Sequence, residues 1–171
     1  MDNIVDRESD AVCRAAKSLG RQYPGADLTT IETVVTLLRM QGRLVRSLDE
    51  RFRPFGLTAA KFDLLMVLHR APSRRLTMWE IGRHLGVTRT NVTGLVDGLE
   101  RDNLVRRLPH PEDRRSLLAE LTAEGEELVH RVLPETWSWM DDLLDDFSLD
   151  EKHQMLRLLR KVQARLGARA E

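Results

Sequence analysis

Cysteine is nearly absent from this 171-residue sequence, which has Cys13 alone, so no disulfide can form within the chain. Long hydrophobic runs are also missing, and none approaches the roughly 20 apolar residues that a membrane-spanning helix needs. The N-terminus is charged and lacks the apolar core of a secretory signal peptide. These features exclude a disulfide-rich extracellular domain and a membrane protein, and we expect a cytoplasmic protein.

The formal net charge is zero, which by itself argues against binding to nucleic acid. The charges are distributed unevenly, however. Residues 69–115 contain ten arginines and six acidic residues, whereas residues 116–156 contain eleven acidic residues against Arg131 and Lys152. A basic middle followed by an acidic region is the pattern expected of a module that faces DNA beside a region that faces away from it.

Residues 77–121 predict two short helices followed by a β-hairpin. Residues 77–85 read as a helix, Gly86 and Val87 as a turn, and a second helix follows from Thr88. Residues 104–108 and 117–121 read as strands on either side of a charged loop. This order is typical of a winged helix-turn-helix, a shape suited to reading duplex DNA. We therefore predict a mainly α fold with a small β-hairpin wing.

Further helices are predicted on both sides of this motif. Hydrophobic residues at helical spacing predict helices over residues 6–19, 27–52 and 58–70. A long helix opens at Thr122, and Pro134 within it predicts a kink or a local break. Ser148 and Glu151 have the spacing of a capping box, which predicts the start of a final helix. Because neither a repeat nor a low-complexity linker interrupts the chain, we expect one domain over residues 1–171.

The second helix of the motif is predicted to have one buried face and one hydrogen-bonding face. Four apolar residues recur at i, i+3, i+4 and i+7 and are expected to be buried: Val92, Leu95, Val96 and Leu99. Asparagine can pair with adenine, arginine with guanine, and threonine with a thymine methyl group or a phosphate. The N-cap and the opposite face carry such side chains, and we predict that they bind DNA: Thr88, Arg89, Thr90, Asn91 and Thr93.

The loop between the two strands is predicted to act as the wing. Asp113 precedes Arg115 by two residues, a spacing that lets its carboxylate orient one guanidinium while Arg114 or Arg115 enters the minor groove. Arg106 and Arg107, at the base of the hairpin, are expected to lie along the phosphates. Such contacts give affinity and salt dependence but no sequence information.

These motifs are similar to those of a known family. Residues 113–125 match a wing pattern of D-x-R and then a strand ending in L-T-x-x-G. Residues 95–105 match the pattern of a recognition helix and first wing strand, and residues 56–68 match that of the preceding helix. Over about residues 30 to 166 the chain resembles the MarR (multiple antibiotic resistance regulator) family. Asn103 replaces the usual glycine at the turn into the wing, where asparagine tolerates a left-handed conformation. Gly94 stands where many relatives carry a long polar side chain, so their base specificity does not carry over.

The resemblance implies a homodimeric repressor that binds double-stranded DNA at a pseudo-palindromic operator and is released by a small, aromatic or phenolic ligand. It implies an N-terminal helical extension over residues 1–25, dimerisation helices over 27–55 and 123–168, and a DNA-binding lobe over 57–121. By position, the ligand-binding candidates are Met40, Arg43, Met66 and Trp79.

Other classes of function fit the sequence less well. Winged helices also serve as protein–protein interaction modules, and DNA binding is distinguished from that alternative by its steep salt dependence. Cys13 lies upstream of the cysteines through which some relatives sense peroxide, so we expect an inert thiol. The five histidines show no H-x-x-x-H spacing, so we expect no metal site. Neither a glycine-rich phosphate loop nor a nucleophile motif is present, so we expect no enzyme and no cofactor.

Overall fold

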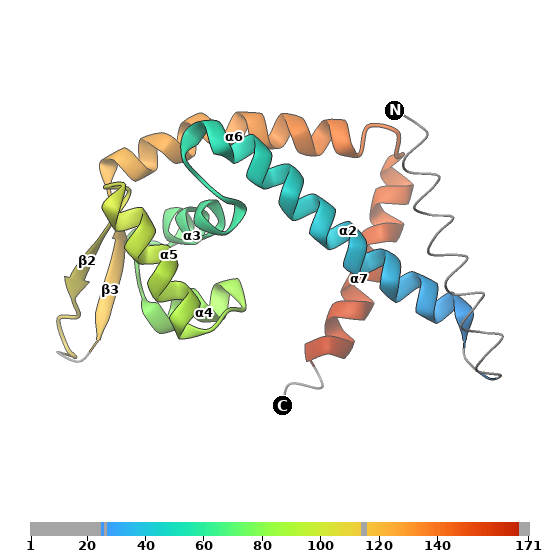
Figure 1. Cartoon of the computed structure of the whole chain (residues 1–171), viewed down its shortest axis with the longest axis horizontal. Coiled ribbons are helices and arrows are strands. Elements are labelled where there is room, and N and C mark those ends of the chain that lie inside the picture. The colour runs from blue at the N-terminus through green and yellow to red at the C-terminus, as the bar shows by residue number, and fades with distance from the viewer. Residues whose placement is uncertain (1–24, 26, 114–115, 168–171) are drawn as a thin grey trace. The chain divides into compact units, whose positions relative to one another are not determined.

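The computed structural model describes residues 25, 27–113 and 116–167 (Figure 1). The predicted helix over 6–19, Cys13, Arg114 and Arg115 lie outside the described residues. The helices are α2 (Leu28–Phe52), the 3-10 helix η1 (Arg53–Phe55), α3 (Ala59–Arg70), α4 (Met78–Leu85), α5 (Arg89–Arg101), α6 (Ala123–Leu143) and α7 (Leu149–Gly167), and the strands are β1 (Arg75–Thr77), β2 (Val105–Pro109) and β3 (Leu117–Leu121). The chain divides into two compact units, and the boundary between Asp63 and Leu64 falls within α3.

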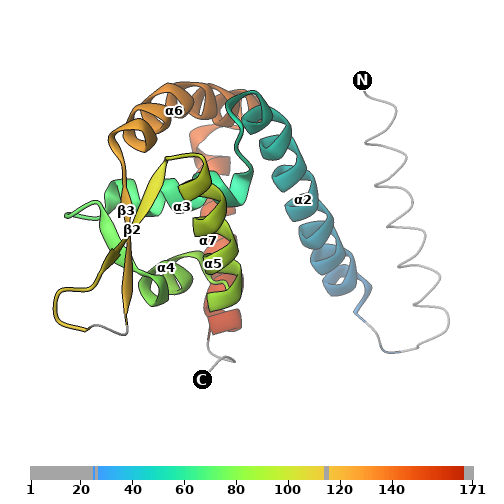
Figure 2. The same cartoon turned by 60° about the vertical axis from the view of Figure 1, so that its left-hand side comes forward.

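The described strands form an antiparallel sheet in the order β1-β3-β2. Strands β2 and β3 make the predicted hairpin, with Val105 opposite Leu121 and Pro109 opposite Leu117 (Figure 2). The sequence predicted β3 at its observed bounds and β2 one residue too early, but it missed β1. Three residues are too few to show an alternating pattern, and β1 exists because Leu76 pairs with Ala119 in β3.

The core of the second unit is built from the apolar faces predicted for its helices. Val92, Val96 and Leu99 of α5 are fully buried, and so is Ile81 of α4. Leu95 was also expected to be buried and is only half-buried. Strands and the start of α6 complete the core with Val105, Ala119, Val129 and Val132. The buried faces of α4 and α5 leave the opposite face of α5 for solvent.

Local hydrogen bonds define where the helices begin. Thr77 and Glu80 form a capping box at the start of α4, in which the Glu80 carboxylate accepts from the Thr77 backbone N–H at 2.8 Å and the Thr77 hydroxyl accepts from the Glu80 backbone N–H at 3.2 Å. The backbone and side-chain hydrogen bonds from Thr77 hold the pKa of Glu80 below its ordinary value. Ser148 and Glu151 repeat this arrangement at the start of α7, as predicted. Asn103 adopts the expected left-handed conformation, with φ of 59°.

Helix α6 continues through Pro134, so the local break predicted as one alternative does not occur, and the kink stays a prediction. Proline removes one N–H donor, and the other hydrogen bonds of this 21-residue helix maintain it.

The two tryptophans of α6 face different sides of the helix, as their spacing of two residues requires. Trp139 is buried, whereas Trp137 is 58% exposed. Among the described residues, no helix is both long and apolar enough to cross a membrane.

The first unit contains α2, whose N-cap is Asp27. At the other end, the Phe52 ring packs against the Phe62 ring with centroids 4.6 Å apart, and the Asp49 carboxylate accepts from the Ala59 backbone N–H at 2.7 Å. These contacts join the end of α2 to the start of α3. Apolar side chains along the rest of α2 are exposed in the single chain, including Val34, Leu38 and Val45.

Gly125, in the first turn of α6, explains the glycine of the L-T-x-x-G pattern. A Cβ at this position would overlap the carbonyl oxygen of Leu104 and the side chain of Leu121. The Thr122 hydroxyl also donates to the Asn103 carbonyl at 2.8 Å, and the Thr122 backbone N–H donates to the Leu104 carbonyl at 3.2 Å. The start of α6 is therefore held directly against the turn that leads into the wing.

We predict that Gly125→Ala destabilises the fold by about 3 kcal/mol, because the added methyl group meets rigid backbone. Gly94→Ala is the matched control, since a Cβ there meets nothing within 4 Å in the middle of α5. That control is expected to stabilise the protein by roughly 0.5–1 kcal/mol through helix propensity. Urea denaturation of each variant at one protein concentration measures both effects, and equal stabilities of the two variants would contradict the packing argument.

Candidate nucleic-acid interface

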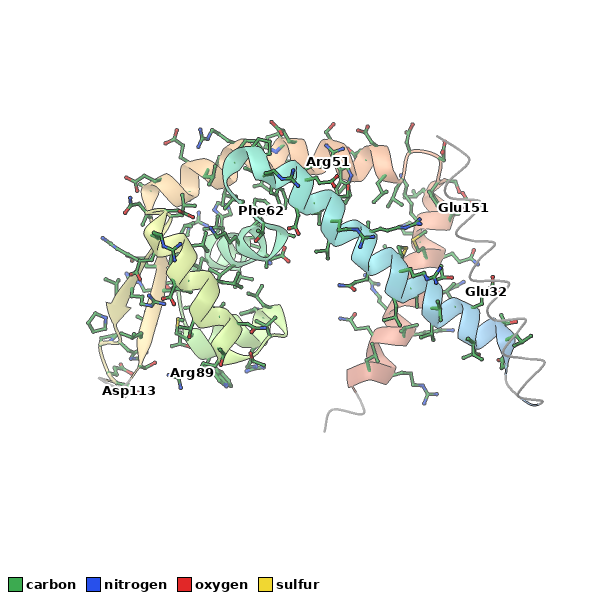
Figure 3. All side chains as sticks on the ribbon, in the orientation of Figure 1. Glu32, Arg51, Phe62, Arg89, Asp113 and Glu151 are labelled. Atoms are coloured by element: carbon green, nitrogen blue, oxygen red, sulfur yellow. The ribbon has the colours of Figure 1, made fainter. Side chains whose placement is uncertain are left out.

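The N-terminal end of α5 presents the predicted reading face to solvent. Thr88 caps the helix, and its hydroxyl accepts from the Asn91 backbone N–H at 3.4 Å. Five side chains of this face are exposed: Thr88, Arg89, Thr90, Asn91 and Thr93. Figure 3 marks Arg89 at this end of the helix and Asp113 at the tip of the hairpin. A helix end with exposed N–H groups and hydrogen-bonding side chains suits phosphates and base edges alike.

The wing loop is closed by its own backbone. The His110 backbone N–H donates to the Ser116 carbonyl at 3.1 Å, and the Ser116 backbone N–H donates to the Asp113 carbonyl at 2.9 Å. Asp113 is exposed. Arg114 and Arg115 lie outside the described part of the chain. The contacts predicted for them, and the role of Asp113 in orienting Arg115, therefore stay predictions.

Arg107 joins the wing to α5. Its guanidinium binds the Asp97 and Glu100 carboxylates, each at 2.5 Å, and donates to the Thr93 carbonyl at 3.4 Å. Its backbone N–H also donates to Glu100 at 3.0 Å, and its side chain is only 22% exposed. Burial by itself lowers the pKa of Arg107, but the bonds to Asp97 and Glu100 raise it above its ordinary value. The structure shows a bridge within the protein, and the phosphate contact that the sequence predicted for Arg107 stays a prediction.

Arg106 points to the other side of the sheet and pairs with Glu120. The Arg106 Nε lies 2.5 Å from one Glu120 oxygen, and the Arg75 Nε lies 3.5 Å from the other. Glu120 is buried, whereas the Arg106 side chain is 64% exposed. Sequence reasoning missed Arg75 as a neighbour of Arg106, because the two meet only through the pairing of β1 and β2 with β3.

A cleft of about 790 Å³ lies between α4, α5 and the wing. Trp79, 65% exposed, lines it with Arg83, whose guanidinium lies 4.8 Å from the tryptophan ring centroid. Arg89, Thr93 and Arg107 also line it, so the cleft shares residues with the reading face. Of the ligand candidates, Trp79 therefore lies in a cleft. Met40 and Arg43 on α2 are exposed, Met66 on α3 is half-buried, and their role stays a prediction.

Comparisons with known proteins agree with this geometry. A model of the MarR family matches residues 55–116. The HTH-type transcriptional repressor YetL of Bacillus subtilis (strain 168) is 32% identical over 145 residues, which cover 85% of this chain and 87% of YetL.

Two solved structures are also similar. Sco3205, a MarR family transcriptional regulator from Streptomyces coelicolor in complex with DNA, is 28% identical with a TM-score of 0.72, over 77% of this chain and 85% of that one. BpsR of Bordetella bronchiseptica, whose DNA binding is regulated by 6-hydroxynicotinic acid, is 25% identical with a TM-score of 0.68, over 77% of this chain and 98% of that one. Sco3205 and YetL are described as transcriptional regulators, which agrees with the expectation that this chain is not an enzyme.

We predict that Arg107→Ala lowers the free energy of unfolding by about 2 kcal/mol, between the values for fully buried and fully exposed ion pairs. Asp97 and Glu100 then face each other without a cation between them. Arg106→Ala is the matched control on the same strand and is expected to cost less than about 1 kcal/mol, because Arg75 still pairs with Glu120. Urea denaturation compares the two, and an equal cost would show that Arg107 does not hold the wing to α5.

Proposed function

We propose that this chain, which belongs to the MarR family of winged helix-turn-helix transcriptional regulators, is a homodimeric repressor that binds a pseudo-palindromic operator and leaves it when a small aromatic acid binds. The observation that carries the proposal is the exposed, hydrogen-bonding N-terminal face of α5, fixed beside the wing by Arg107. The similar regulator Sco3205 was solved in complex with DNA, which supports the same activity here.

In the proposed complex, α5 enters the major groove. Asn91 reads an adenine and Arg89 a guanine, because their side chains offer the matching pairs of hydrogen-bonding groups. Thr90 and Thr93 contact phosphates or thymine methyl groups, and Thr88 supports the helix end that faces a phosphate. Arg106 of the wing contacts the phosphate backbone of the DNA. Arg114 or Arg115 enters the minor groove, and Asp113 orients one of them.

Exposed apolar side chains support a homodimer. They recur along α2, the C-terminal half of α6, the turn that follows it and α7, within the segments assigned to dimerisation, and include Val34, Leu38, Val45, Trp137, Met140, Leu143, Phe147, Leu156, Leu159, Val162 and Leu166. Monomeric proteins rarely expose so many apolar side chains at helical spacing, whereas a second copy buries them. Two copies would present two α5 helices to successive major grooves.

The cleft beside α5 supports release by an aromatic acid. Trp79 offers an aromatic surface, and Arg83 and Arg89 offer guanidinium groups that bind a carboxylate. Because Arg89 and Thr93 also belong to the reading face, a ligand in this cleft and the DNA compete for the same residues. The regulation of BpsR by 6-hydroxynicotinic acid is in line with this chemistry. Met40, Arg43 and Met66 remain alternative ligand contacts, proposed from sequence position.

The test of DNA recognition is affinity selection of genomic DNA fragments by the purified protein at near-physiological salt. We expect enrichment of an inverted repeat whose half-sites lie about one helical turn apart, roughly 10 base pairs. Asn91→Ala is then expected to lose preference for one base pair, at symmetric positions in both half-sites, and to weaken binding to the preferred site by about 1–3 kcal/mol.

Arg106→Ala is the control for a phosphate contact. It is expected to weaken binding to every sequence alike and to reduce the slope of log affinity against log salt by about 1. Uniform weakening by Asn91→Ala would assign Asn91 to the backbone instead. If the wild-type protein enriches no sequence and loses DNA on a modest rise in salt, its attraction to DNA is nonspecific, which favours the alternative of a winged-helix protein–protein interaction module.

We also predict that Val162→Asp dissociates the dimer, because it places a charge within the apolar face of α7. Ala164→Asp introduces the same charge on the opposite, polar face of that helix and is expected to leave the dimer intact. Sedimentation velocity over a range of protein concentrations distinguishes the two outcomes. A dimer of unchanged affinity in Val162→Asp would remove α7 from the interface.

A further inference from the structure

Three side chains with metal-binding atoms meet away from the DNA-facing surface. They are His69 near the end of α3 and Glu126 and His130 near the start of α6, and one ligand atom from each lies within 4.8 Å of the other two. None of the three lines the cleft beside α5 or belongs to the reading face. The proposed DNA recognition leaves this cluster without a function.

The spacing on α6 is that of a helical metal site. Glu126 and His130 are separated by four residues, so they lie one above the other on one face of the helix. His69 approaches that face from α3, with its ring edge to face against the His130 ring and centroids 5.3 Å apart. A search for paired histidines in the sequence misses this set, because one helical ligand is a glutamate and the third comes from a distant helix.

His69 carries a second indication of a ligand. Its Nδ1 is buried and, within the described part of the chain, accepts and donates no hydrogen bond. The nearest carboxylate oxygen, Glu126 Oε1, lies at 3.7 Å, beyond hydrogen-bonding distance. Buried polar atoms without a partner are rare in proteins and require an explanation, such as a bound ion. Burial, first, and the charge of Arg74 lower the pKa of His69.

We propose that His69, Glu126 and His130 bind a Zn²⁺ ion that links α3 to α6. Two imidazoles and one carboxylate are a donor set typical of zinc, with water as the fourth ligand. Donor atoms of a tetrahedral zinc site lie about 3.3 Å apart, since each bond is about 2.0–2.1 Å long. The His69–Glu126 separation of 3.7 Å is already close to that value. His130 is exposed, which gives the ion and its water a path to the site.

Arg74 already pairs with Glu126, one of the three proposed ligands. Its Nη2 lies 2.8 Å from Glu126 Oε1, so the arginine and a cation compete for the same carboxylate. Removal of Arg74 would release Glu126 and remove a positive charge from the neighbourhood of the ion. An adventitious metal bound at surface histidines would not respond to this change.

Zinc binding is measured by competition with a chromophoric chelator, on tag-free protein carrying Cys13→Ser so that the thiol does not contribute. We expect one Zn²⁺ per chain. His69→Ala and His130→Ala are each expected to weaken binding by at least about tenfold, comparable to the loss of a metal-site partner in other proteins. His84→Ala, an exposed histidine on α4, is the matched control and should bind as the parent does. Arg74→Gln should bind zinc more tightly than the parent.

Thermal unfolding provides an independent readout. Zinc is expected to raise the melting temperature of the parent and of His84→Ala, and not that of His130→Ala, because an ion bound only to the folded state stabilises it. Since His130 is exposed, its replacement leaves the fold intact, as circular dichroism will verify. Equal zinc affinity in the parent and His130→Ala, or no change in Arg74→Gln, would overturn the proposal and indicate an adventitious ion only. Neither result bears on DNA binding, which the site does not share.

Discussion

The bridge from Arg107 to Asp97 and Glu100 fixes the geometry on which the DNA-facing surface depends. In the proposed complex α5 and the wing contact different grooves, so the distance and angle between them must be constant before any side chain can select a base. One guanidinium on β2 binds two carboxylates and a carbonyl on α5. Its planar, bidentate geometry limits rotation of the strand against the helix in a way that a lysine ammonium does not. The cost is that one arginine near the DNA has its charge compensated by the protein itself.

A second constraint acts at the base of the hairpin, just before β2, where steric exclusion and hydrogen bonding act together. Gly125 lets α6 approach the Leu104 carbonyl, and Thr122 bonds both that carbonyl and its neighbour at Asn103. The left-handed residue Asn103 reverses the chain between α5 and β2. Thus α5, the hairpin and α6 are connected through a few backbone contacts, so a displacement at the start of α6 reaches the wing through short, stiff links.

Features set by neighbours in the sequence were predictable, and features set by distant partners were not. The caps at Thr77, Thr88, Thr122 and Ser148 are local, because each side chain meets a backbone N–H at most three residues away. The strand β1 escaped prediction because it depends on β3, and the internal role of Arg107 depends on acids up to ten residues away. The local break predicted at Pro134 does not occur, because one missing donor does not outweigh the other hydrogen bonds of a long helix. The meeting of His69 with Glu126 and His130 requires the packing of α3 on α6, which no local pattern encodes.

The ion pairs around the wing also bear on how such a protein finds its site in a genome. Arg74 and Arg107 bind carboxylates of the same chain, whereas Arg75 and Arg106 share the single carboxylate of Glu120 and so keep a net positive charge. An arginine neutralised in this way displaces fewer counterions from a DNA duplex, so it adds little to attraction for unrelated sequence. Residence on such sequence is then short, and the protein spends less of its time on the many sites that are not its target. Internal pairing of the arginines thereby favours a fast search and leaves discrimination to the side chains at the start of α5 that we propose read the bases.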